Sequence, residues 1–176
     1  MKKVLFTSAV LLGASLMFTS CEKEKDNEKP VIALEDPADG EVLFIGKGVH
    51  FEMNLSDNEG LKSYKVNMHD NMANPHTHSA ARASASDSIY LSHTWMEDDF
   101  VKKGETPIAD MKSKHIHHHH IVIPEKMDGK PVREGKYHFM VYCTDMNGNE
   151  SYVSRNVILK YPKPGEAEDP HHDHNH

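Results

Sequence analysis

Residues 135–143 read Gly-Lys-Tyr-His-Phe-Met-Val-Tyr-Cys, and apolar side chains occupy every second position from Tyr137 to Cys143. Because successive side chains of a β-strand point to opposite faces of a sheet, this alternation predicts a strand with one buried face. The next segment, Asp145-Met-Asn-Gly-Asn149, is typical of a tight turn. Residues 152–161 then predict the last strand of the chain.

The same pattern of short strands and turns recurs upstream, while helix signals are weak. Further strands are predicted at residues 31–34, 42–45, 49–55, 61–69 and 115–123, with one more at 89–96. The remainder of 70–114 is predicted to be irregular. About seven short strands at this spacing predict an all-β, immunoglobulin-like β-sandwich with a long irregular insertion. Gly135-x-Tyr137 resembles the Gly-x-Tyr corner that begins the sixth strand of such domains.

The N-terminus has the features of an export signal. Lys2 and Lys3 precede an apolar run at residues 4–18, which is short for a transmembrane helix. Phe18-Thr-Ser-Cys21 resembles a bacterial lipobox, in which the cysteine is lipidated and becomes the first residue of the mature protein. Phe18 stands where that motif usually has leucine. We therefore expect a signal peptide at 1–20 and a membrane anchor on Cys21; a plain secretory signal is the alternative.

Composition divides the rest of the chain into three parts. Residues 21–29 are charged and predict a flexible tether, which also loosely resembles an acidic sorting signal for the outer cell surface. Residues 30–161 make one domain, and residues 162–176 a disordered, histidine-rich tail. The expected location is therefore the outer membrane, with surface exposure left open. Without Cys21, Cys143 has no partner for an intramolecular disulfide.

Net charge argues against nucleic acid as a partner. The full chain has 20 lysines and arginines against 27 aspartates and glutamates. Removal of residues 1–20 takes away two lysines and leaves 18 against 27, a formal charge of −9. A negative surface repels phosphate backbones and attracts cations.

Fifteen histidines are the main functional signal, because neutral imidazole is a common ligand of zinc and copper. In the predicted sandwich, strands 61–69 and 136–144 are antiparallel neighbours, which places His69 beside His138. Both are out of phase with the buried positions, so both point from the outer face of one sheet. Cross-strand side chains start roughly 5 Å apart, a separation that suits two ligands of one ion.

The loop after His69 supplies His76 and His78, a His-x-His pair whose side chains share a face when extended. Together with His69 and His138 they predict a tetrahedral zinc site, with copper as an alternative metal. Asp70 is predicted to accept a hydrogen bond from one of the imidazoles. The alternative is that these are independent surface histidines.

The run His115-Ile-His-His-His-His120 is a second cluster of histidines in the sequence. If Ile121 and Ile123 face the core, alternation places His119 on their side and turns His118 and His120 outward. His118-x-His120 then predicts a second chelating pair, which joins the first site, forms its own, or makes a weak exposed patch. The tail residues predicted to capture metal as a flexible chelator are His171, His172, His174 and His176.

Seven motifs follow one another in order along residues 29–160: Lys29-Pro-Val-Ile32, Asp57-Asn-Glu-Gly-Leu61, His69-Asp-Asn71, His76-Thr-His78, His119-His-Ile-Val-Ile-Pro124, Gly135-Lys-Tyr-His-Phe139 and Asp145-Met-Asn-Gly-Asn149. Together they resemble a family of Bacteroidota lipoproteins known as domain of unknown function 4625. The resemblance implies a surface lipoprotein with an immunoglobulin-like fold, and it implies no known activity. Both histidine-rich segments, 115–120 and 171–176, exceed what the family pattern requires.

Three classes of function remain at this point. We expect a lipoprotein that binds zinc or another divalent metal for capture, buffering or delivery, with an outer-membrane transporter or receptor as a partner. The alternative is a non-catalytic module that binds a polysaccharide or an outer-membrane protein, for example through Trp95 and Tyr90. Catalysis is disfavoured because the sequence contains no His-Glu-x-x-His or Gly-x-Ser-x-Gly motif.

Overall fold

The computed structural model describes residues 26–71 and 88–163. The predicted signal peptide, Cys21, His76, His78 and the histidines of the tail lie outside the described residues. In the described part, no helix is both long and apolar enough to cross a membrane.

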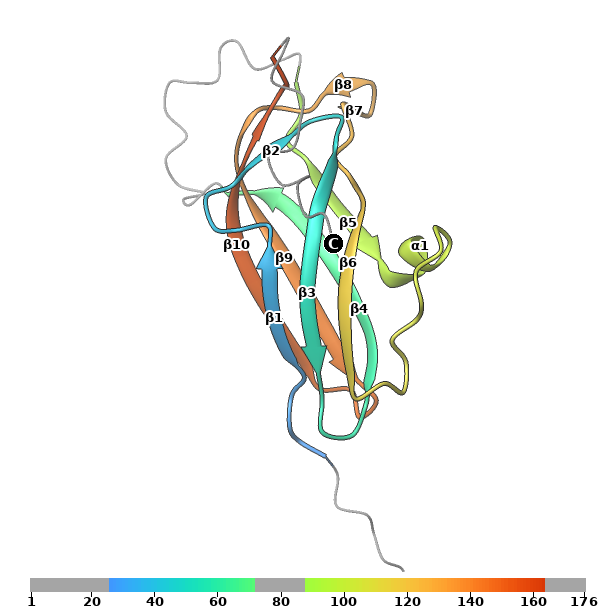
Figure 1. Ribbon diagram of the computed structural model, residues 1–176. Helices are drawn as coiled ribbons and strands as arrows, with labels where there is room; N and C mark the ends of the chain where they lie inside the picture. Colours follow the sequence, from blue (N-terminus) through green and yellow to red (C-terminus); the bar gives the residue numbers. More distant parts are fainter. Residues whose placement is uncertain (1–25, 72–87, 164–176) are drawn as a thin grey trace, which may run out of the picture.

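Two antiparallel-dominated sheets lie face to face and form an all-β sandwich (Figure 1). The smaller sheet has the order β1-β3-β6, with β1 at Val31–Asp36, β3 at Gly48–Ser56 and β6 at Ser113–Val122. The larger sheet has the order β2-β10-β9-β4-β5, with β2 at Val42–Phe44, β10 at Glu150–Lys160, β9 at Gly135–Asp145, β4 at Leu61–Asp70 and β5 at Ser92–Met96. β2 runs parallel to β10, and all other neighbours are antiparallel.

Apolar residues at alternating positions of both sheets form one core, as the sequence predicts. The face of β3 that carries Val49 and Leu55 and the face of β9 that carries Tyr137 and Val141 are both buried. Cys143 is also buried at the inner face of β9, and this burial raises the pKa of its thiol to about 12. The thiol therefore stays protonated and behaves as a small apolar side chain.

The corner before β9 is held by Tyr137. Its hydroxyl donates a hydrogen bond to the carbonyl oxygen of Arg133, four residues earlier, at 2.7 Å. It also accepts one from the backbone N–H of Leu91 at 3.3 Å. This is the tyrosine corner of immunoglobulin-like domains, and it confirms the interpretation of Gly135-x-Tyr137.

Part of the predicted irregular insertion is regular. β5 is followed by the short helix α1, Glu97–Val101, which the sequence interpretation treated as loop. Glu97 is buried, and one of its carboxylate oxygens accepts the backbone N–H of Ile108 at 2.8 Å, so it organises the loop after α1. Trp95 belongs to the core. A short hairpin of two strands with two residues each, β7 at Lys126–Met127 and β8 at Lys130–Pro131, precedes β9.

A β-bulge in β6 reverses the predicted orientation of its histidines. Val49 pairs with Ile121 and Phe51 with His118, so two residues of β6 lie opposite the single residue His50. The extra residue breaks the alternation counted back from Ile121. The prediction that His118 points outward is therefore wrong: His118 is 5% exposed and faces the core, whereas His119 is exposed.

A candidate metal centre on the outer face of the smaller sheet

The outer face of the β1-β3-β6 sheet carries a row of imidazoles. On β3, His50 and Glu52 alternate with buried apolar residues and point away from the core. On β6, the outward positions are His115, His117 and His119. The two strands are hydrogen-bonded neighbours, and Glu52 lies opposite His117 in their register. Cross-strand pairing therefore brings the donor atoms of both strands together.

Three of these side chains could hold one ion. His50, Glu52 and His117 each place one ligand atom within 4.8 Å of the others. The Nε2 atoms of His50 and His117 are 2.9 Å apart and share a hydrogen bond, with one ring donating and the other accepting. A carboxylate oxygen of Glu52 lies 3.9 Å from Nε2 of His50. The donor set is two nitrogens and one oxygen.

These distances are close to those of a zinc site. With zinc–nitrogen bonds of about 2.0–2.1 Å and tetrahedral angles, two imidazole nitrogens lie about 3.3 Å apart. Opening the His50–His117 contact by a few tenths of an ångström would therefore admit the ion. The ring that donates this hydrogen bond must carry its proton on Nδ1 instead, so that the Nε2 atoms of both rings present lone pairs to the metal. Three protein ligands leave a fourth tetrahedral position for water or another donor.

Neighbouring groups position the candidate ligands. Nε2 of His115 contacts the other carboxylate oxygen of Glu52 at 2.9 Å. This hydrogen bond is the main cause that holds the pKa of Glu52 below its usual value, and electrostatic interactions with His117, His115 and His50 lower it further. Glu52 is therefore an anion and a ready ligand. The ring of His119 stacks on His50, with centroids 5.0 Å apart.

The predicted contact between His69 and His138 is present on the opposite side of the sandwich. The two residues are register partners of β4 and β9, and their ring centroids are 5.3 Å apart. Nδ1 of His69 lies 2.6 Å from Oδ1 of Asn67 and donates a hydrogen bond to it, so Nε2 is the ring nitrogen that a metal could use. The acceptor for His69 is Asn67, and the hydrogen bond of Asp70 with one of the imidazoles stays a prediction. His76 and His78, the other predicted ligands, lie outside the described residues.

His118 and His120 do not form the predicted outward pair. The rings of Phe51 and Phe100 lie 5.1 and 4.6 Å from the ring of His118. Burial is the main cause that lowers the pKa of His118 to about 4, so its ring is neutral near pH 7. Nδ1 of His118 accepts the backbone N–H of His120 at 3.3 Å, while Nε2 of His120 pairs with Glu105 at 3.1 Å.

His50 and Glu52 are not among the metal ligands predicted from the sequence. The missed signal is that both lie on the polar face of the strand at 49–55, whose alternation was recognised. Their partners on β6 could not be assigned, because the bulge that turns His117 and His119 outward has no clear mark in a run of four consecutive histidines.

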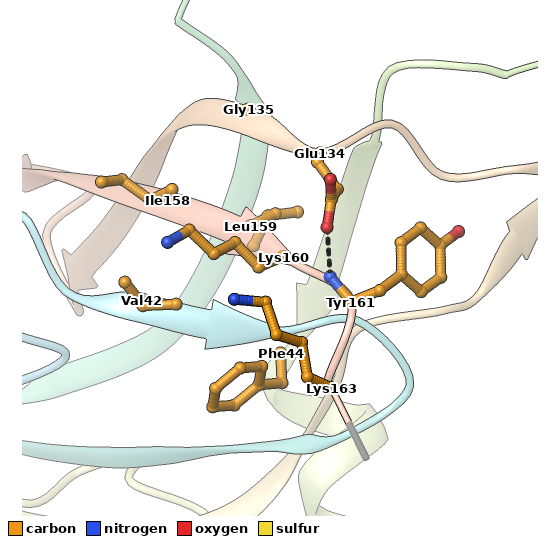
Figure 2. A pocket seen from close by; sticks show the side chains of 9 residues that line it. All are labelled: Val42, Phe44, Glu134, Gly135, Ile158, Leu159, Lys160, Tyr161 and Lys163. Atoms are coloured by element: carbon orange, nitrogen blue, oxygen red, sulfur yellow. Dashed lines mark hydrogen bonds between the residues drawn. The ribbon is translucent and has the colours of Figure 1, made fainter. Parts of the chain in front are cut away.

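A pocket of about 590 Å³ at the end of β10 is separate from these histidines (Figure 2). Phe44 and Leu159 contribute to its apolar lining, and Lys160 and Lys163 add two ammonium groups. Its one carboxylate, on Glu134, accepts the backbone N–H of Tyr161 at 2.7 Å. No histidine or cysteine lines the pocket, so it has no role in the candidate metal centre.

Fold and site define a class: a β-sandwich domain that carries histidines on the outer faces of both sheets. The chain belongs to the family described as Domain of unknown function (DUF4625), whose model matches residues 19–160. The resemblance seen in the sequence motifs is thus confirmed. A search of curated proteins found no match.

Proposed function

We propose that this protein is a non-catalytic, membrane-anchored lipoprotein that binds a divalent transition metal, with zinc preferred over copper. The observation that carries the proposal is the convergence of His50, Glu52 and His117 on the outer face of the smaller sheet. Two imidazole nitrogens and a carboxylate are typical zinc ligands. Thiolate and thioether ligands, which favour copper(I), are missing from this set.

The accessibility of the centre supports capture or transfer rather than permanent structural binding. His117 is exposed, and the side chains of His50 and Glu52 are 18% and 26% exposed. Three ligands leave one coordination position open, through which a metal ion can be exchanged with a second protein. In this proposal Cys21 holds the domain at the outer membrane, and a transporter or receptor there is the partner.

The pair His69 and His138 forms the core of a second proposed site, which His76 and His78 complete. Asp70 remains a proposed hydrogen-bond acceptor for an imidazole N–H of this second site. The tail residues His171, His172, His174 and His176 are proposed as loose chelators that raise the local metal concentration. These sites differ from the first in that their further ligands come from outside the described residues.

Calorimetric titration of zinc into the detergent-solubilised, metal-free full-length chain tests the proposal. Replacement His117→Gln keeps a polar side chain of similar length and removes the ligand. We expect it to weaken the tightest zinc-binding phase by at least about 10-fold, because second-shell changes alone can have effects of that size. The matched control is His93→Gln, which changes an exposed histidine of β5 that lies outside the cluster.

A double variant provides a second readout for the same site. His50→Gln/His117→Gln removes both imidazole ligands of the proposed centre and leaves Glu52 as its only ligand. We expect this variant to lose the tightest zinc-binding phase, whereas His93→Gln should keep it. An unchanged affinity and stoichiometry of the tightest phase in the double variant would refute the assignment.

A further inference from the structure

Three aspartates from three separate segments meet at the end of the sandwich where the N-terminal segment joins it (Figure 1). Asp57 begins the turn between β3 and β4, Asp145 ends β9, and Asp26 precedes β1. One carboxylate oxygen from each lies within 4.8 Å of the other two. The cluster lies at this end of the sandwich and shares no residue with the proposed site of His50, Glu52 and His117.

Burial separates this cluster from an ordinary acidic surface patch. The side chain of Asp145 is fully buried, at 0% exposure. Its Oδ1 accepts the backbone N–H groups of Asn147 and Asn149, and its Oδ2 accepts the side-chain amide of Asn149 at 2.7 Å. These donors are neutral, so the negative charge of a buried carboxylate is left without a counter-charge.

Asp57 supplies the observation that points to a ligand. Its Oδ1 atom is used by the turn, where it accepts the backbone N–H groups of Glu59 at 2.9 Å and Gly60 at 2.7 Å. Its Oδ2 atom is buried from solvent and has no hydrogen-bond partner in the described part of the chain. A buried carboxylate oxygen with no partner is expensive unless a cation or a donor satisfies it.

The cationic side chain of Lys112 is close to this cluster, but its ammonium group donates to the backbone carbonyl oxygen of Asn58 at 2.9 Å and not to a carboxylate. Among residues 26–71 and 88–163, no lysine, arginine or histidine forms a salt bridge with these three aspartates. The side-chain amides of Asn58 and Asn147 each donate to a carboxylate oxygen of Asp26, at 3.1 and 3.3 Å. Rotation of either amide by 180° would present a carbonyl oxygen in place of the nitrogen.

We propose that Asp26, Asp57 and Asp145 form a calcium-binding site that is distinct from the transition-metal centre. Calcium takes six to eight oxygen ligands in a flexible geometry, which three carboxylates, rotated asparagine amides and water can supply. Oxygen-only ligands disfavour zinc relative to the histidine cluster. Because the ligands come from turns and are completed by water, we expect a calcium dissociation constant like that of extracellular calcium-binding modules, about 0.1–1 mM.

A calcium ion at this site would hold residues 26–29 against the β-sandwich. Asn149 already donates to the carbonyl oxygens of Asp26 and Glu28, and the hydroxyl of Ser151 donates to that of Pro30. Residues 26–29, which the sequence assigned to the tether, therefore contact the domain. A calcium ion shared by Asp26, Asp57 and Asp145 would lock this segment and shorten the free tether after Cys21.

Thermal unfolding of the metal-free, detergent-solubilised full-length chain, with and without 5 mM calcium chloride, tests the proposal. For the wild type we expect calcium to raise Tm by about 5 °C, since it binds only the folded state. Asp57→Asn should abolish this rise. In metal-free buffer the same variant should melt at the same temperature as the wild type or higher, because it removes a negative charge and keeps the oxygen that serves the turn.

Asp98→Asn is the matched control, since it removes one exposed aspartate of α1 and should retain the calcium response. The proposal is overturned if calcium leaves the wild-type Tm unchanged, if Asp57→Asn responds like the wild type, or if magnesium gives the same rise. A lower Tm of Asp57→Asn in metal-free buffer also overturns it, because Asp57 would then be structural. Zinc affinity should be unaffected by Asp57→Asn, which separates this test from that of the histidine site.

Discussion

At the scale of single residues, histidines of one short run have different chemistry according to the face on which they lie. His117 points outward and shares a hydrogen bond with His50. His118, the next residue, is packed among aromatic rings and has Nε2 buried without a partner in the described part of the chain. Because desolvation disfavours the charged form, the buried ring is a poor base.

Stability should depend on pH through His118. Its pKa of about 4 in the folded protein lies below the value of about 6.5 expected after unfolding, so the unfolded state binds the proton more readily. Its contribution is complete above about pH 6.5 and is lost as the pH falls towards 4, by about 3 kcal/mol in total. The groups that face it are His119, His120, Lys103 and the aromatic rings.

Urea unfolding of His118→Leu at pH 7 and pH 4.5 measures this effect. The decrease in unfolding free energy between the two pH values should be about 2 kcal/mol smaller than in the wild type. His93→Gln, an exposed control, should keep the wild-type dependence. Equal pH dependence in His118→Leu and the wild type would contradict the assignment of a depressed pKa.

At the scale of secondary-structure elements, two local devices decide which side chains face outward. The bulge opposite His50 changes the phase of β6, and the corner at Tyr137 fixes where β9 begins. The first could not be derived from the sequence, since four consecutive histidines have no alternation. The second could, because a buried tyrosine two residues after glycine is part of a recurrent pattern.

Tyr137→Phe tests the corner. The substitution keeps the ring in the core but leaves the carbonyl of Arg133 and the N–H of Leu91 without this partner. We expect a loss of about 1–3 kcal/mol in unfolding free energy, measured by urea denaturation. Tyr152→Phe, at a position 65% exposed, should change stability by less than about 0.5 kcal/mol. A neutral effect of Tyr137→Phe would show that the corner is not a stabilising contact.

At the scale of the whole molecule, the sandwich places two groups of the described histidines on opposite outer faces. His50 and His117 lie on the outer face of one sheet, and His69 and His138 on the outer face of the other. Because packed sheets are about 10 Å apart, with the core between them, the two groups lie too far apart to share an ion. His115, His117 and His119, the outward residues of the 115–120 run, therefore do not join the site of His69.

Zinc stoichiometry of the full-length chain should reflect this separation. We expect removal of residues 171–176 to reduce the number of weakly bound ions and to leave the tightest phase unchanged, since we propose that His50, Glu52 and His117 provide the tightest site. Calorimetry of the two forms measures both quantities. A loss of the tightest phase on truncation would place the strongest chelator in the tail instead.

The sequence by itself determined the main strands and, apart from β6, their buried faces, because alternation is encoded locally. The contact of His69 with His138 followed from the strand order of the predicted immunoglobulin-like sandwich. The sequence did not determine α1 or the docking of residues 26–29, which depend on distant partners such as Ile108 and Asn149. Only the tertiary structure decided that His50, Glu52 and His117 converge, and that Asp57 meets Asp145. The physical reason is that register, bulges and turn contacts arise from pairing between segments far apart in the chain, and no single segment specifies them.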